Sequence, residues 1–224
     1  MNNLIIYQTP SWLTAFTTGR DSGVEALGLR LEELALPRQV HSDNICWMRE
    51  SGRPEQTDAV ITDKPGLCVC VKTADCIPVL LYDTRQHIVA AVHAGWRGTV
   101  ARIVQKTINQ IKPVSPSDIH AIIGPGISLE WFEVGDEVYE TFKTAGFPME
   151  RIARRFPSKA LPLKGTGESW HIDLWDANRW LLEQMGVEDI FVEGTCTRSS
   201  MDFYSARRET INTGRNYNGI YINE

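Results

Sequence analysis

Short apolar runs separated by polar and glycine-rich turns occupy the middle of the chain. Leu67–Lys72 and Ile77–Tyr82 are nearly continuous apolar runs, and His87–His93 and Ile119–Ile123 have the same composition. Runs of this length, rich in valine and isoleucine, are typical of buried strands. Val187–Val192 predicts a further strand later in the chain.

Helical patterns appear mainly in the second half of the chain. Apolar residues at helical spacing predict an amphipathic helix over Thr99–Ile111. Val134–Ala145 predicts a second helix, which Gly146 would end. A third is bounded by Asp173 as its cap and Gly186 as its stop.

The order of these elements predicts an α+β fold, because strands cluster first and then mix with helices. The Asn218-Gly219 pair predicts a tight turn near the C-terminus. A basic stretch with Arg151, Arg154, Arg155, Lys159 and Lys164 predicts a solvated loop. A length of 224 residues fits one domain spanning 1–224.

Composition narrows the functional classes. Hydrophobic and charged fractions of 42% and 23% are those of a globular protein, and a net charge of −5 argues against a nucleic-acid partner. No apolar run approaches the roughly 18 residues that span a bilayer. Met1–Gln8 lacks the basic region of a signal peptide, and five cysteines without framework spacing do not indicate disulfides. We therefore expect a cytoplasmic protein without membrane contact.

Three segments combine reactive side chains with irregular backbone: Arg38–Ser42, Thr73–Pro78 and His93–Thr99. The third leaves an apolar strand, turns at glycines and is expected to open a helix at Thr99. Helix N-termini suit anions, and Arg97 would add a bidentate phosphate partner. The alternative is a simple tight turn with a solvated arginine.

The residue types alone are consistent with either a metal site or purely structural roles. A single histidine beside a strand is commonly a hydrogen-bonded structural residue, and a buried cysteine can act as a small hydrophobe. His41, Cys76 and His93 have no HExxH or CxxC spacing. Both interpretations therefore stay open at this stage.

Five motifs taken together resemble one known family. They are, in chain order, Gln39-Val40-His41, Thr73-Ala74-Asp75-Cys76-Ile77-Pro78, His93-Ala94-Gly95-Trp96-Arg97-Gly98-Thr99, Ile123-Gly124-Pro125 and Tyr204-Ser205-Ala206-Arg207. This set resembles the laccase-domain family, also called the YfiH or multicopper polyphenol oxidase family, from about Arg38 to the last strand. One departure is Gly126, where many relatives have cysteine.

The resemblance implies a fold, a metal and an activity. The fold would be a layered two-sheet core flanked by helices, similar to the CNF-toxin cysteine hydrolase fold. His41, Cys76 and His93 would bind the metal and be catalytic. Members have been described as polyphenol oxidases and as enzymes that phosphorolyse adenosine, inosine, guanosine and methylthioadenosine and deaminate adenosine. Purine nucleosides and phosphate would then be the partners.

Further residues are candidates for this chemistry. Arg38, Arg97 and Arg207 could bind phosphate, and Asp75 could be an acid or base or could be structural. The oligomeric state stays open.

The ligand types favour zinc over copper. A four-copper oxidase needs about ten histidines, whereas this chain has five and no His-x-His pair. Two histidines, one cysteine and an open position suit catalytic zinc, which lowers the pKa of a bound water to about 7 for attack on adenine. The alternatives are a single-copper polyphenol oxidase, a metal-free hydrolase with Cys76 as nucleophile and His93 or His41 as base, and a non-catalytic binding protein.

Overall fold

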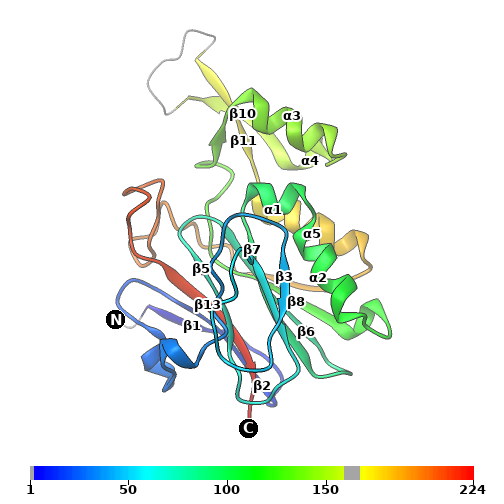
Figure 1. Cartoon of the computed structure of the whole chain (residues 1–224). Coiled ribbons are helices and arrows are strands. Elements are labelled where there is room, and N and C mark those ends of the chain that lie inside the picture. Colours follow the sequence, from blue (N-terminus) through cyan, green and yellow to red (C-terminus); the bar gives the residue numbers. More distant parts are fainter. Residues whose placement is uncertain (1–2, 159–166) are drawn as a thin grey trace.

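Three β-sheets form the framework of the described residues, 3–158 and 167–224 of this computed structural model (Figure 1). The six-stranded sheet has the order β12-β8-β6-β7-β4-β3, with β3 (Ile45–Trp47), β4 (Ala59–Thr62), β6 (Ile77–Asp83), β7 (Ile88–Ala94), β8 (Ile119–Ile123) and β12 (Asp189–Val192). The four-stranded sheet has the order β1-β2-β13-β5, with β1 (Leu4–Ile6), β2 (Leu13–Thr18), β5 (Val69–Thr73) and β13 (Asn216–Ile222). The three-stranded sheet has the order β10-β11-β9, with β9 (Glu133–Val134), β10 (Ala153–Pro157) and β11 (Glu168–Ile172).

The α-helices pack against the six-stranded and three-stranded sheets, and 3-10 turns lie against the four-stranded sheet. The α-helices are α1 (Trp96–Val100), α2 (Ile103–Ile111), α3 (Asp136–Thr144), α4 (Met149–Ile152) and α5 (Leu174–Gln184), with the 3-10 turns η1 (Val24–Leu27), η2 (Leu31–Glu33) and η3 (Pro116–Asp118). Across the described part of the chain, no helix has the length and apolar character needed to cross a membrane.

The two larger sheets pack face to face, which confirms the predicted α+β fold with a two-sheet core. Val71 of β5 and Ile220 of β13 meet Leu80 of β6 and Val89 of β7 in one buried apolar cluster. The other face of the six-stranded sheet packs against α2 and α5 in a second cluster (Figure 1). Every residue of β6 and β7 is buried, because both faces of these strands are covered.

The long helix predicted over Thr99–Ile111 is two helices. The first, α1, begins earlier, at Trp96, and the second begins at Ile103. Arg102 lies between them in the left-handed region with φ 62°. Its guanidinium donates to the backbone oxygen of Ala145, 3.0 Å away. Such a distant tertiary contact has no signature in the local apolar pattern.

The other two predicted helices are confirmed with small shifts at their ends. Helix α3 begins at Asp136, later than predicted, because Val134 belongs to β9. Gly146 lies just after the end of α3 and has a φ of 78°. The Asp173 carboxylate accepts from the backbone N–H of Asp176 at 3.0 Å, which caps α5 as expected.

The tight turn predicted at Asn218-Gly219 is wrong, because both residues lie inside β13. A Cβ atom at Gly219 would lie 2.5 Å from the Phe16 ring, so glycine is needed there for close packing between strands. The Asn218 amide bonds across the sheet to the Thr17 hydroxyl at 2.8 Å and the Thr73 hydroxyl at 3.0 Å.

The basic stretch predicted as a loop is also partly wrong. Arg151 belongs to α4, where it pairs with Asp176 and Glu183, and Arg154 and Arg155 belong to β10. The predictions for Lys159 and Lys164 lie outside the described residues.

Candidate metal centre

Cys76 lies where the chain crosses from the four-stranded to the six-stranded sheet, between β5 and β6. Asp75 turns the backbone with φ 96°, a conformation that L-residues rarely adopt. Its carboxylate holds this turn, accepting from the Thr197 hydroxyl at 2.7 Å and from the backbone N–H of Arg207 at 2.6 Å. Both Asp75 oxygens therefore fix the position of Cys76, which favours the structural role over the acid–base role.

His93 is set by strand register at the end of β7. It pairs with Pro78 of β6, which places it beside the Cys76 turn. Asp58 fixes the residue twice, because its backbone oxygen accepts from the His93 N–H at 2.8 Å and its Oδ1 lies 2.8 Å from His93 Nδ1. With Nδ1 engaged, His93 Nε2 is the ring atom left to act as a ligand.

His41 lies on a loop that the same Asp58 side chain organises. The carboxylate accepts from the backbone N–H groups of Val40, His41 and Ser42 at 3.2, 3.0 and 2.7 Å, and from the Ser42 hydroxyl at 2.7 Å. Asp58 is fully buried. One carboxylate thus holds both histidines. The sequence did not identify Asp58 as a site residue. Its only sequence signal is that an aspartate directly precedes the apolar residues of β4.

The three predicted ligands come together in space. One ligand atom from each of His41, Cys76 and His93 lies within 4.8 Å of the other two. Gly95 makes room for them, since a Cβ atom there would lie 3.1 Å from both Cys76 Sγ and His41 Cδ2. One thiolate and two imidazoles fit zinc or copper, and a three-ligand set leaves a position for water or substrate.

The electrostatics of the centre favour a thiolate. Burial by itself would raise the pKa of Cys76, but the charges and hydrogen bonds of His93 and His41 lower it to about 6. Burial would lower the pKa of His93, but the Cys76 thiolate and the Asp58 carboxylate raise it to about 9. A thiolate is both the metal-ligating and the nucleophilic form of cysteine.

Two hollows meet at Cys76. We call the first the basic pocket. It has a volume of about 250 Å³ and is lined by Gln39, His41, Lys72, Thr73, Ala74, Cys76, His93, Ala206, Ile211 and Arg215. We call the second the apolar recess. It has a volume of about 60 Å³ and is lined by Asp75, Cys76, Trp96, Ile127, Phe132, Leu174 and Arg207. Since Cys76 lines both, the centre has a polar cationic side and an aromatic side.

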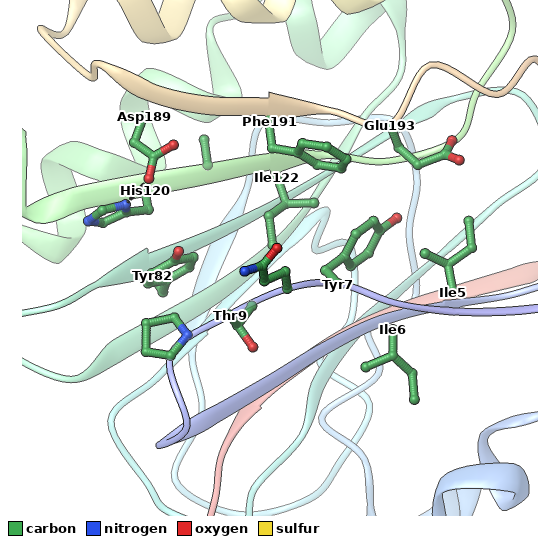
Figure 2. Close-up of a pocket in the computed structure, with 13 residues that line it drawn as sticks. Ile5, Ile6, Tyr7, Thr9, Tyr82, His120, Ile122, Asp189, Phe191 and Glu193 are labelled. Carbon is green, nitrogen blue, oxygen red and sulfur yellow. Dashed lines mark hydrogen bonds and ion pairs between the residues drawn. The ribbon is translucent and has the colours of Figure 1, made fainter.

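A larger cavity of about 720 Å³ lies elsewhere, beside β1, β8 and β12 (Figure 2). Tyr82 stacks on His120 there with ring centroids 4.9 Å apart, and His120 pairs with Asp189. None of the three ligands lines this cavity. Although this cavity is larger, we do not take it as the candidate active site. The side chains with metal-binding or nucleophilic chemistry lie around Cys76.

The predicted phosphate-binding arginines separate in the structure. Arg38 is 66% exposed and pairs with Glu55 at 2.8 Å, and exposed Arg97 stacks over the Trp96 ring at 4.3 Å. Neither lines the basic pocket or the apolar recess. Arg207 does line the recess, where its guanidinium donates to the backbone oxygens of Trp131 and Glu133.

The prediction that a helix begins at Thr99 is wrong. Helix α1 begins at Trp96, so Thr99 lies within it, and the Thr99 N–H already donates to the Gly95 oxygen at 2.8 Å. This correction removes the helix-dipole argument for phosphate binding at that position.

Comparison with known proteins places this arrangement in a family. The family model described as multi-copper polyphenol oxidoreductase laccase matches residues 14–223. The chain belongs to this laccase family. A "Purine nucleoside phosphorylase" from Bacteroides thetaiotaomicron is 44% identical over 86% of the chain and 74% of its own length. "Adenosine deaminase RL5", from an unknown prokaryotic organism, is 40% identical over 87% of the chain and 77% of its own length.

Solved structures agree with this family assignment. A Neisseria meningitidis protein of the DUF152 family superposes with a TM-score of 0.81 at 28% identity, covering 99% of this laccase-family chain and 100% of that one. The YfiH protein of Bacillus licheniformis gives a TM-score of 0.81 at 25% identity, covering 95% and 94%. The resemblance inferred from the five motifs is therefore confirmed.

Proposed function

We propose that this protein is a zinc-dependent purine nucleoside enzyme that phosphorolyses adenosine, inosine, guanosine and methylthioadenosine and deaminates adenosine. The observation that carries the proposal is the convergence of His41, Cys76 and His93 beside two pockets. The names of two relatives at 40% identity or more support the substrate class.

His41, Cys76 and His93 would hold the zinc ion, and Asp58 would orient both histidines. Bound there, zinc would act as a Lewis acid that activates water at neutral pH. In phosphorolysis, a phosphate oxygen bonds to C1′ of the ribose while the C1′–N9 bond breaks. The purine leaves with the electrons of that bond and takes up a proton, so the site must hold phosphate and base on opposite sides of C1′.

The side chains around Cys76 would divide the two roles that this reaction requires. Trp96 and Phe132 give the apolar recess aromatic faces of the kind on which a base can stack. The basic pocket offers cationic groups for an anion. Asp75 would position Cys76 between the two. We include a cytoplasmic location in the proposal, which five free thiols support.

Two other activities follow from the same three side chains. Copper also binds one cysteine and two histidines, and the description of the family model names polyphenol oxidation. The low pKa of the Cys76 thiol, set by His93 and His41 against the effect of burial, equally suits a metal-free hydrolase.

The test is product analysis on zinc-loaded, copper-loaded and metal-free protein given adenosine, inosine and a phenol. We expect inosine to be cleaved only with phosphate, and adenosine to release ammonia, both with zinc. Copper-dependent phenol oxidation without conversion of either nucleoside would replace the proposal with the oxidase. Full turnover by the metal-free protein without phosphate would replace it with the hydrolase.

A further inference from the structure

Two cationic side chains share the basic pocket with the metal ligands. Lys72 comes from the end of β5, and Arg215 comes from the residue directly before β13. Lys72 pairs with Tyr217 across the two strands. Because residues two apart in a strand share a face, Arg215 continues the face on which Lys72 lies. Strand register therefore brings both cations to one side of the centre.

No carboxylate balances these cations in the described part of the chain. The residues that line the basic pocket include neither aspartate nor glutamate. None of the ion pairs between described residues involves Lys72 or Arg215. Burial, together with the nearby charges of Arg53 and Arg215, lowers the pKa of Lys72. Like charges held together without an acidic partner are unfavourable, and a bound anion would relieve that repulsion.

Both side chains are held in place with donors to spare. The Arg215 guanidinium donates to the backbone oxygens of Ile211 at 2.7 Å, of Gly214 at 3.0 Å and of Thr213. A guanidinium has about five N–H donors, so the Nε–H and one Nη2–H stay available. The Gln39 amide exchanges two 2.8 Å hydrogen bonds with the Lys72 backbone, which fixes the base of the lysine side chain.

We propose that the basic pocket is the phosphate subsite of this enzyme, with Lys72 and Arg215 as its anion-binding side chains. The inference rests on the proposed phosphorolysis, and it assigns the phosphate to residues other than Arg38 and Arg97. Phosphate bound there would lie on the His41 side of the centre, with the base directed toward Trp96 in the apolar recess. The attacking oxygen and the leaving base would then lie on opposite sides of the ribose.

The test compares the variants Lys72→Met and Arg215→Gln, their combination, and Lys72→Arg in the zinc-loaded full chain. Loss of one charged hydrogen-bonding partner should raise the KM for phosphate in inosine cleavage about ten- to hundredfold, and the double variant should show a larger increase. Lys72→Arg should recover most of the loss. Zinc content should stay at its wild-type value, and adenosine deamination should fall far less than phosphorolysis, because neither requires phosphate. Arg49→Gln, an exposed arginine 3.7 Å from Asp63, is the matched control that should change nothing.

Titration of inorganic phosphate into wild type and variants, followed by calorimetry, separates this inference from the proposed function. If the wild type binds phosphate and the variants do not, the subsite holds even where no phosphorolysis is found, and the proposed function alone fails. If the wild type phosphorolyses inosine and the double variant keeps its KM and phosphate affinity, the subsite assignment is overturned. A parallel fall of deamination and phosphorolysis in folded, zinc-loaded Lys72→Met would overturn it as well.

Discussion

Replacing Asp58 by asparagine tests whether one buried carboxylate builds the metal centre. Asp58 Oδ1 faces the His41 N–H at 3.0 Å and His93 Nδ1 at 2.8 Å. Its Oδ2 accepts from the Val40 N–H at 3.2 Å and from the Ser42 N–H and hydroxyl, both at 2.7 Å. Asparagine has nearly the same shape but only one acceptor oxygen. Whichever way its amide is turned, its NH₂ group faces at least two groups that donated to the carboxylate.

The magnitude follows from this count of donors. A buried donor left without an acceptor costs about 1–3 kcal/mol, so two of them should destabilise the fold by roughly 2–6 kcal/mol. For a chain of this size that corresponds to a fall in Tm of roughly 5–20 °C. If the new amide donates to His93 Nδ1, the ring proton moves to Nε2 and removes the lone pair that would bind zinc. Loss of such an orienting partner typically weakens metal affinity about 10- to 100-fold.

The assay is competition for zinc between the protein and a chelator of known affinity, with a thermal melt of the same samples. Asp83→Asn is the matched control. Asp83 is also buried, and its Oδ1 accepts from the backbone N–H groups of Arg85 and Gln86 at 2.8 and 2.7 Å. It lies at the end of β6 away from Cys76. We expect Asp83→Asn to lower Tm without changing zinc affinity. Wild-type zinc affinity in Asp58→Asn, or equal weakening in Asp83→Asn, would refute the reasoning.

Three further outcomes are expected. Cys76→Ala should lose most bound zinc and lower phosphorolysis and deamination by orders of magnitude, and metal analysis beside product assays checks both. In metal-free protein, Cys76 should react with iodoacetamide at a rate that rises with pH around 6, because neighbouring histidines lower its pKa despite burial, and added zinc should protect it. Cys70, whose pKa burial raises to about 12, should react only after unfolding, as mass spectrometry of the labelled peptides would show. His171→Gln should lower Tm but leave turnover per bound zinc unchanged, because His171 is buried with Nδ1 3.0 Å from the Leu129 oxygen.

Elements with uninterrupted apolar patterns were predictable from the sequence. Ile119–Ile123 is β8 with the predicted bounds, and the run predicted from Ile77 is β6, one residue longer. These strands are covered on both faces, so nearly every position is apolar and the pattern has no gaps. The role of Asp173 as the N-cap of α5 was equally predictable, because a cap and its helix are neighbours in the sequence.

The wrong predictions share a physical cause. At the break between α1 and α2, Arg102 donates a hydrogen bond to Ala145, 43 positions away. Gly219 lies inside β13, where the Phe16 ring occupies the space that a side chain would need. In both cases a tertiary contact overrides a local rule, and neither propensity nor periodicity contains information about such a contact.

The candidate centre shows the same division between local pattern and tertiary contact. Residue types alone could not decide between structural and metal-binding roles for His41, Cys76 and His93, because no short spacing joins them. What joins them is the pairing of His93 with Pro78 and the position of Asp58 directly before β4. Register is not encoded in an apolar run, since every register buries similar surface when both faces are covered. Five hydrogen bonds to one buried carboxylate supply the missing specificity, because only the observed register and loop conformation satisfy all of them together. The chain therefore needs no local metal-binding motif. In such a motif, helical spacing brings ligands one turn apart together, whereas here Asp58 holds His41 and His93, which are 52 positions apart in the sequence.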